Sequence, residues 1–207
     1  RLALEAPAPV RYINLGGGWG IPYFPGECVL DIEPIAVMLE QVQSELVRVL
    51  PAARLVLELG RYLVGEAGVY VARVIDHKVS QGQVFLVTDG GMHHHLAASG
   101  NFGQVIRRNY PVVIGNRLQA SEHETASIVG PLCTPLDLLA DRVELAVAQP
   151  GDLVVVFQSG AYGATASPTD FLGHPTCPEV LVQTGFCQRQ HGWACQAYAA
   201  YCSLWLL

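Results

Sequence analysis

The first third of the chain alternates short apolar runs with one long amphipathic segment. Residues 12–15 form a short apolar run that leads into the glycine-rich loop GGGWG. In residues 31–50, apolar side chains recur at intervals of three and four, the spacing of an amphipathic helix. We expect Asp31 to cap this helix and Pro34 to lie in its first turn. A second apolar run, ARLVLELGR at residues 53–61, completes a strand–helix–strand pattern that predicts a βαβ unit of a parallel sheet or barrel.

After Tyr62 the pattern changes to an alternation of apolar and polar positions. Residues 67–79 and 83–91 both alternate in this way, and the sequence SQGQ supplies a turn between them. Three more short strands are expected in YPVVIGN, TASIVGP and DLVVVF, because Gly, Pro and Asn separate these apolar runs. Short, closely spaced strands of this kind predict an all-β module.

The change of pattern divides the chain into three predicted segments. We place a domain boundary near residue 65, so that residues 1–65 hold the βα units and residues 66–182 hold the β domain. Residues 183–207 form a separate extension with almost no charge and poor periodicity, which we expect to be loosely packed. The candidate metal ligands in and just before it lack the CxxC spacing of a structural zinc site: Cys177, Cys187, Cys195, Cys202 and His191.

Composition narrows the class of protein. The 207 residues are 51% hydrophobic and 14% charged, enough to bury a sizeable core. A complete eight-stranded α/β barrel takes about 250 residues, so the chain is too short for one. The net charge of −6 argues against a nucleic-acid partner. No run of apolar residues is long enough to predict a membrane span.

The termini and cysteines suggest an intracellular chain. The opening RLALEAPAPV lacks the pattern of a signal peptide, and we expect it to be an internal segment of a longer chain. Six cysteines are unevenly placed along a chain large enough to need no disulfides, so we expect reduced thiols and a cytoplasmic location. Lysine is unusually scarce, since Lys78 stands alone against eleven arginines.

Two loops that follow the predicted parallel strands are candidates for binding an anion. The backbone amides of Gly16 to Gly20 could cradle a phosphate because no Cβ blocks its approach, although a tight βα turn explains the glycines equally well. In the loop Glu58 to Arg61, Gly60 could offer an amide and Arg61 a fixed charge. Glu58 could keep a ring nitrogen protonated, and a capping ion pair is the alternative.

The β domain adds three weaker candidates. Three consecutive histidines, residues 93–95, cannot all face one metal from a strand or helix, so we do not expect a zinc site. Asp89, at a strand end before two glycines, is a better site candidate. Tyr162 lies in the glycine-rich stretch SGAYGATAS, where its hydroxyl could reach a phosphate or a carboxylate, or the ring could pack against a turn.

The order of these motifs is more specific than any one of them. Six features follow one another over residues 10–182. They are a GGG loop, an E-x-G-R loop, a switch to the β pattern, a D-G-G strand end, the C-x-x-x-D pair Cys133 and Asp137, and G-A-Y. In this order they resemble the fold-type III pyridoxal-phosphate-dependent amino-acid decarboxylases, which include diaminopimelate and ornithine/arginine decarboxylases. The resemblance implies an α/β plus all-β fold, the C-terminal part of a pyridoxal-phosphate-binding (β/α)8 barrel followed by a Greek-key β-barrel domain.

The resemblance also implies roles for particular residues. Cys133 would be the acid that returns a proton to the substrate carbon after carbon dioxide leaves, delivered from the partner subunit of a homodimer with shared active sites. The expected cofactor-binding residues are Gly16, Gly17, Gly18, Glu58, Gly60, Arg61 and Tyr162. The expected substrate-binding residues are Arg61, Asp89, Tyr110, Asp137 and Tyr162.

Three departures from the family pattern refine the expectation. Leu59 replaces the proline of E-P-G-R, a mild change. Thr134 replaces the acidic residue that reads a distal substrate amine, which favours a substrate without a free distal amine. The sequences CTPLD and GAYGATASP resemble those of a subgroup linked to secondary metabolism or exopolysaccharide clusters. One relative in this subgroup decarboxylates a glutamyl unit on an acyl-carrier protein. The cofactor-binding lysine lies upstream in the family, and Lys78 does not match it, so we expect this chain alone to be inactive.

Two other functions stay open at this point. The missing lysine and the altered ELGR loop also fit a catalytically inactive dimerisation or regulatory homologue. An amino-acid racemase shares the barrel-plus-β architecture, but the C-x-x-x-D and E-x-G-R motifs argue against it.

Overall fold

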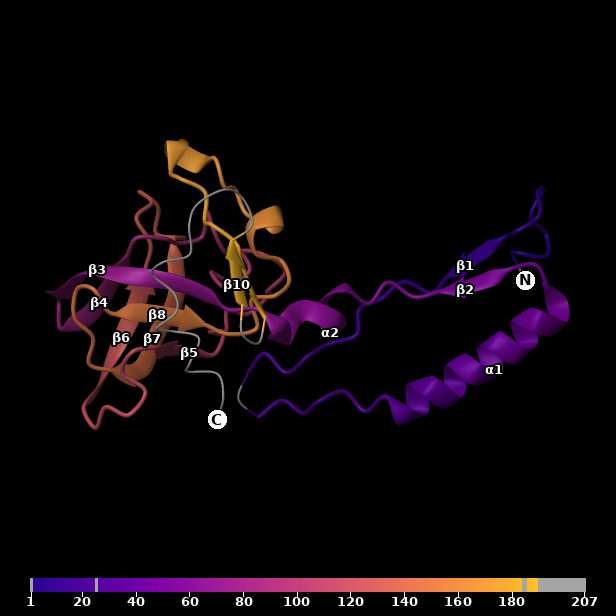
Figure 1. Cartoon of the computed structure of the whole chain (residues 1–207), viewed down its shortest axis with the longest axis horizontal. Helices are drawn as coiled ribbons and strands as arrows, with labels where there is room; N and C mark the ends of the chain where they lie inside the picture. The colour runs from indigo at the N-terminus through magenta and orange to yellow at the C-terminus, as the bar shows by residue number, and fades with distance from the viewer. Residues whose placement is uncertain (1, 25, 184–185, 190–207) are drawn as a thin grey trace.

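The computed structural model describes residues 2–24, 26–183 and 186–189, and its N-terminal part is a βαβ unit. Strand β1 (Tyr12–Asn14) pairs in parallel with β2 (Arg54–Val56), and helix α1 (Glu33–Val49) connects them. Figure 1 shows this unit extending away from the rest of the molecule, with α1 running beside the two strands. The strand–helix–strand prediction is confirmed.

Helix α1 starts one residue later than expected. Its N-cap is Ile32, which makes no side-chain capping bond, so the prediction of Asp31 as the cap residue is wrong. The Asp31 carboxylate nevertheless accepts the Glu33 N–H at 3.1 Å, because an aspartate two residues before a free helical amide can reach it. Pro34 lies in the first turn, as expected.

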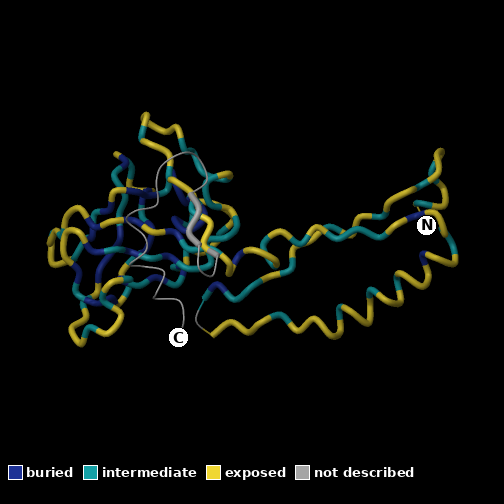
Figure 2. The backbone as a smooth tube through the Cα atoms, in the orientation of Figure 1, coloured by how far each residue is buried: buried dark blue, intermediate teal, exposed yellow. Residues whose placement is uncertain are grey.

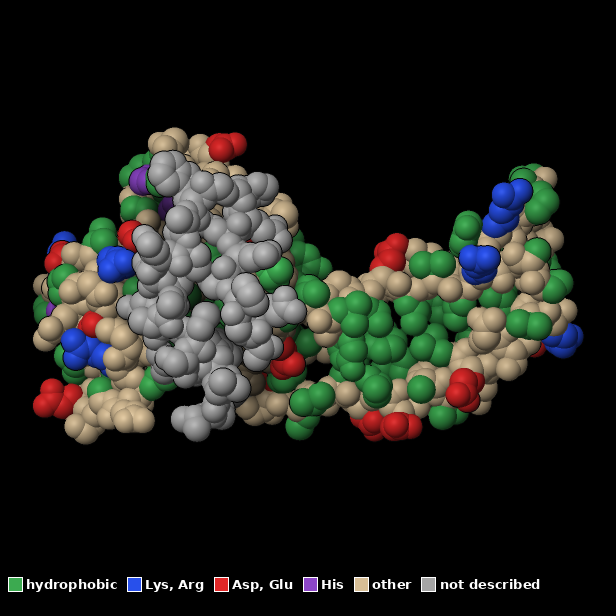
Figure 3. All heavy atoms as spheres, in the orientation of Figure 1, with side chains coloured by type: hydrophobic (Ala, Val, Ile, Leu, Met, Phe, Trp, Pro, Cys, Tyr) green, Lys and Arg blue, Asp and Glu red, His purple; other side chains and the backbone are tan. Residues whose placement is uncertain are grey.

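The apolar face of α1 is only partly covered. Leu46 is its one buried residue, and Ile35, Leu39 and Val42 on the same face are half-buried. Figure 2 shows most of α1 exposed, and Figure 3 shows hydrophobic side chains gathered between the helix and the two strands. The βαβ unit therefore presents apolar surface that is not buried within the described part of the chain.

A short helical link, α2 (Gly60–Val64) and the 3-10 turn η1 (Gly65–Ala67), joins this unit to a six-stranded sheet. The strand order is β5-β8-β3-β4-β6-β7, with β4 and β6 parallel and the other pairs antiparallel. The strands are β3 (Tyr70–Ser80), β4 (Gln83–Thr88), β5 (Val112–Ile114), β6 (His123–Val129), β7 (Leu138–Ala146) and β8 (Leu153–Val156).

The sheet curls until its two edge strands, β5 and β7, lie against each other. The Asn109 side chain bridges the remaining gap, because its amide donates to the Asp141 carbonyl at 2.7 Å and its oxygen accepts the Asp141 N–H at 2.9 Å. Arg107 also donates to the Leu138 carbonyl. Side chains thus satisfy edge groups that no strand reaches, and the sheet is nearly closed.

The expected β3–β4 hairpin is confirmed. Its turn residues Gln81 and Gly82 both have positive φ angles, 51° and 76°, as a two-residue type I′ turn requires. Strand β7 was not predicted, because Asp141 and Arg142 interrupt its apolar run. Arg142 has φ of 46°, and the β6–β7 register shifts nearby, so the strand continues through an irregularity that no alternation pattern reveals.

The core lies inside the curled sheet. The inward side chains Val74, Leu86, Ile128 and Val154 are all completely buried. Figure 2 shows the strands of the sheet as the most deeply buried part of the chain. Most of this core comes from the sheet, and Tyr23 of the N-terminal segment joins it, with Ile21 and Phe24 packed alongside. The segment that follows the glycine loop is therefore anchored on the β domain.

After the sheet, two 3-10 turns, η2 (Ala164–Ala166) and η3 (Phe171–Gly173), lead to a hairpin of β9 (Val180–Gln183) and β10 (Phe186–Arg189). The predicted loose extension falls mainly on residues 190–207, outside the described residues. No helix within the described ranges is both long and apolar enough to cross a membrane.

Candidate active site

Three loops distant in sequence meet at one cavity of about 170 Å³. They are the glycine loop after β1, the Glu58–Arg61 loop after β2 and the loop carrying Tyr162 after β8. The lining residues are Gly18, Trp19, Glu58, Leu59, Gly60, Arg61 and Tyr162. The cavity therefore brings together five of the residues expected from the motifs, and adds Trp19 and Leu59, which the sequence reasoning missed.

The first two loops interlock through their backbones. The Glu58 N–H donates to the Gly16 carbonyl at 2.8 Å. A Cβ on Gly17 would lie 1.9 Å from the Glu58 carbonyl oxygen, so only glycine fits there. Gly16 and Gly18 have φ angles of 75° and 81°, in the left-handed region. The glycine loop thus packs closely against the backbone of Glu58, and its remaining amides leave a surface that an anion could approach.

Asn14 orients the carboxylate of Glu58. Its side-chain amide donates to Glu58 Oε1 at 2.6 Å, and its oxygen accepts the Gly16 N–H at 2.7 Å. One side chain at the end of β1 therefore fixes both the glycine loop and the acid at the end of β2. Sequence reasoning missed Asn14, and its position two residues before the first glycine of the loop was the available signal.

Arg61 lies between two aromatic rings. Its guanidinium carbon is 5.0 Å from the centre of the Tyr23 ring and 4.9 Å from that of Tyr162. Arg61 takes part in none of the ion pairs between described residues. Burial raises the pKa of Tyr23, with Arg61 opposing the rise. The rings position the cation while leaving its charge available to an anionic ligand.

The Tyr162 loop is held firmly at its base. A Cβ on Gly160 would lie 1.7 Å from the Val64 carbonyl oxygen, which packs this loop against the end of α2. The Ser159 hydroxyl and His95 Nε2 are 2.9 Å apart, so the histidine supports the loop from the core. Tyr162 itself has φ of 57°, an unusual angle for a tyrosine, which points its ring at Arg61.

The three histidines are core residues. His93, His94 and His95 are all buried, and His94 contacts the Tyr70 hydroxyl at 3.2 Å and the Pro175 carbonyl at 2.8 Å. Burial lowers the pKa of both His93 and His95 to about 4. Within the described chain, no group of three or more histidine, cysteine or acidic residues is placed to hold a metal ion.

Six expected site residues do not line the cavity: Gly16 and Gly17, which precede the lining residue Gly18, and four residues of the β domain. Asp89 lies exposed after β4, and its carboxylate accepts the Arg73 N–H at 2.8 Å. Tyr110 is buried, with its ring centre 4.7 Å from that of Tyr23, and burial raises its pKa. Asp137 is buried, whereas Cys133 is exposed. The roles expected for these residues stay predictions.

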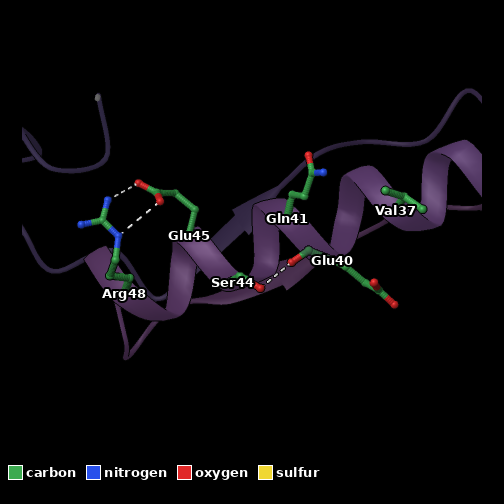
Figure 4. A pocket seen from close by; sticks show the side chains of 6 residues that line it. All are labelled: Val37, Glu40, Gln41, Ser44, Glu45 and Arg48. Atoms are coloured by element: carbon green, nitrogen blue, oxygen red, sulfur yellow. Dashed lines mark hydrogen bonds and ion pairs between the residues drawn. The ribbon is translucent and has the colours of Figure 1, made fainter.

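A second depression lies along the outer face of α1 (Figure 4). Glu45 and Arg48 point toward each other there and form an exposed ion pair at 2.6 Å, and Ser44 donates to the Glu40 carbonyl. All its lining side chains come from one helix, and none of the motif residues lies in it. It is an ordinary solvated helix surface.

Comparison with known proteins places these features in a family. The model of the pyridoxal-dependent decarboxylase C-terminal sheet domain matches residues 29–160. An L-glutamyl-(BtrI acyl-carrier protein) decarboxylase of Niallia circulans is 46% identical, over 84% of this chain and 41% of its own length. A diaminopimelate decarboxylase of Aquifex aeolicus is 31% identical, over 85% of this chain and 39% of its own length. The chain thus spans about two fifths of the length of these relatives.

Solved structures share the fold. A diaminopimelate decarboxylase of M. jannaschii in complex with L-lysine superposes with a TM-score of 0.76 at 23% identity, covering 91% of this chain and 42% of that one. The nearly closed sheet described above is thus the C-terminal sheet domain of fold-type III decarboxylases. The family expected from the order of the motifs is confirmed: this chain belongs to the pyridoxal-dependent decarboxylases.

Proposed function

We propose that the whole protein is a pyridoxal-phosphate-dependent decarboxylase of an amino acid, and that the cavity described above is part of its active site. The observation that carries the proposal is the meeting of the glycine loop, Glu58 and the Arg61 guanidinium at one cavity. No ion pair among the described residues includes this guanidinium. An anion cradle, an oriented carboxylate and a fixed guanidinium are the groups that a phosphorylated pyridine cofactor and a carboxylate substrate need.

The residues present fit pyridoxal phosphate. Gly16, Gly17 and Gly18 would hold its phosphate, because Gly17 is packed as closely as the backbone allows and Gly18 opens onto the cavity. Glu58, held by Asn14, would face the ring nitrogen. Bound pyridoxal phosphate supplies an electron sink for the electron pair left when the carboxylate departs. Gly60, Arg61 and Tyr162 complete the anion-binding side.

Cys133 would be the catalytic acid of the reaction. Its thiol is exposed on a loop of the β domain and does not line the cavity of its own chain. We infer a homodimer in which the loop of one subunit enters the site of the other. There the Cys133 thiol would give its proton to the substrate carbon that loses carbon dioxide, so that a C–C bond breaks and a C–H bond forms.

The substrate inferred from the chain is a carrier-bound glutamyl unit. Thr134, next to Cys133, has no charge to recognise a distal ammonium, and its hydroxyl accepts the Leu136 N–H at 3.3 Å. A glutamyl group joined to a carrier protein has no free distal amine. The similarity to the Niallia circulans decarboxylase supports this assignment over free diaminopimelate.

The βαβ unit would be the last part of a (β/α)8 barrel. The parallel pairing of β1 and β2 and the uncovered apolar face of α1 support this reading. The free thiols of Cys28, Cys133 and Cys177 fit a cytoplasmic enzyme.

The test is a decarboxylation assay on the whole protein loaded with pyridoxal phosphate. Carbon dioxide release and the intact mass of the carrier protein are followed with a glutamyl-carrier thioester, with free glutamate and with diaminopimelate. We expect turnover of the carrier-bound substrate and slower turnover by the Cys133→Ala variant. Turnover of diaminopimelate alone would reject the substrate assignment, and no carbon dioxide from any of the three would reject the function.

A further inference from the structure

Asp137 is a buried acid whose carboxylate is fully engaged by the backbone. Its side chain is 3% exposed. Oδ1 accepts the Met92 N–H at 2.6 Å, and Oδ2 accepts the Leu132 N–H at 2.8 Å. Met92 follows β4 and Leu132 follows β6, so one carboxylate ties together two loops that the sheet alone leaves unconnected.

Two glycines make room for this carboxylate. A Cβ on Gly91 would lie 2.2 Å from Asp137 Oδ1, and a Cβ on Gly130 would lie 2.3 Å from Oδ2. A separation under 3 Å is not compatible with a real Cβ, so neither position accepts a side chain without moving Asp137. The aspartate and both glycines form one packed unit at the base of the loop.

The loop above this unit is closed by its own backbone. The Gly130 N–H donates to the Asp137 carbonyl at 3.0 Å, and the Asp137 N–H donates to the Thr134 carbonyl at 3.1 Å. Cys133 is adjacent to Leu132, whose amide Asp137 holds, and its own thiol is exposed. The place of the Cys133 thiol relative to the sheet therefore depends on the Asp137 carboxylate.

We propose that Asp137 is a positioning residue for Cys133, not a group that contacts substrate. This proposal rests on the proposed function of Cys133 as the proton donor. Both carboxylate oxygens already accept backbone N–H groups, and burial leaves the side chain without access to a ligand. The substrate-binding role expected for Asp137 from the motif order is replaced, in this proposal, by control of the loop that carries the acid.

The first experiment measures the loop itself and needs no activity. In an Asp137→Asn variant, either orientation of the new amide turns an NH2 group toward a backbone N–H, so one hydrogen bond is lost. We expect hydrogen exchange of the Met92 and Leu132 amides to accelerate by roughly tenfold or more. Asp76→Asn, at an exposed position of β3, makes the same charge change and should leave both rates unchanged. Unchanged exchange in Asp137→Asn would overturn the proposal.

The second experiment uses steady-state kinetics of the whole protein loaded with pyridoxal phosphate. We expect Asp137→Asn to lower kcat by about tenfold with KM changed by less than about twofold, because the acid and not the substrate is misplaced. In a Cys133→Ala background the same substitution should have little further effect on kcat, because the group that it positions is gone. A general loss of stability would instead add to the Cys133 defect.

The outcomes separate the two proposals. A raised KM with unchanged kcat, or additive effects in the double variant, would overturn the positioning role even if decarboxylation is confirmed. Absence of decarboxylation in the parent protein would reject the proposed function, while the exchange result would still test the link between Asp137 and the loop. Gly130→Ala, which alters no polar group but presses on the carboxylate, should reproduce the Asp137→Asn exchange pattern if the packed unit sets the loop.

Discussion

The side-chain amide of Asn14 donates to Glu58 Oε1 at 2.6 Å, which joins the ends of two parallel strands that are 44 residues apart in sequence. Replacing Asn14 by Ala removes this bond and frees the Glu58 carboxylate to rotate. We expect the affinity of the whole protein for pyridoxal phosphate to fall by about tenfold, the effect of losing one charge-assisted hydrogen bond. A cofactor titration followed by absorbance measures it. Gln41→Ala, on the exposed face of α1, is the control, and equal affinity in both variants would contradict the orienting role of Asn14.

The glycine loop offers a matched pair of substitutions. A Cβ on Gly17 would collide with the Glu58 carbonyl, whereas a Cβ on Gly20 meets nothing within 4 Å. We expect Gly17→Ala to abolish stoichiometric cofactor binding and Gly20→Ala to leave it close to that of the parent, because only the first change separates the two loops. Cofactor content per chain after dialysis checks both. Normal content in Gly17→Ala would show that the loops do not need their close contact.

The buried His95 predicts how stability depends on pH. Burial lowers its folded-state pKa to about 4, below the usual value of 6.5, so the unfolded state binds a proton that the folded state resists. The folded state therefore loses stability as pH falls through this window. Between about pH 7.5 and about pH 5, His95 alone should lower the free energy of unfolding by about 2 kcal/mol.

Urea unfolding of the chain at both pH values measures this effect. His95→Gln removes the titrating ring, so the pH dependence of the variant should be shallower, whatever its stability at neutral pH. His123→Gln, at an exposed position of β6, is the matched control. An unaltered pH slope in His95→Gln would mean that His95 is not the residue that resists protonation.

The single lysine gives a direct test of where the cofactor can be held. Lys78 lies on β3, eight residues beyond Tyr70, which places it about 26 Å along the strand from the end that joins η1. Borohydride reduction of this 207-residue chain with pyridoxal phosphate, followed by peptide mass mapping, should give no stoichiometric label on Lys78. A full label there would mean that the site is built differently and that the assigned cofactor residues are wrong.

Mixing two defective variants of the whole protein tests the shared active site. Glu58→Ala removes the group proposed to face the cofactor, and Cys133→Ala removes the proposed acid. If Cys133 comes from the partner subunit, each mixed dimer regains one intact site, and random mixing should restore about a quarter of the parent activity. No recovery, after mass analysis confirms that mixed dimers have formed, would place Cys133 and Glu58 in the same chain's site.

Local pattern determined much of this protein. Apolar intervals of three and four located α1, and alternation of apolar and polar residues located β3 and β4. Gly82 marked the turn between β3 and β4. These features depend on neighbouring residues alone. The order of the loop motifs also predicted one site for the glycine loop, the Glu58–Arg61 loop and Tyr162, and residues of all three line one cavity. Strand β7 was not predicted from the sequence, because Arg142 adopts a left-handed conformation inside it. The strand is held by pairing with β6 and not by the preference of its own residues.

Only the tertiary structure decided what several motif residues do. Asn14 and Glu58 meet because their strands lie side by side in parallel, and Arg61 is placed between aromatic rings from segments 38 and 101 residues away. The sequence predicts Asp137 as an acid of the site, but in the structure its carboxylate is buried against Gly91 and Gly130. Hydrogen bonds from backbone amides distant in sequence, such as that of Met92, hold it there. Such contacts join residues distant along the chain, and no local spacing encodes them.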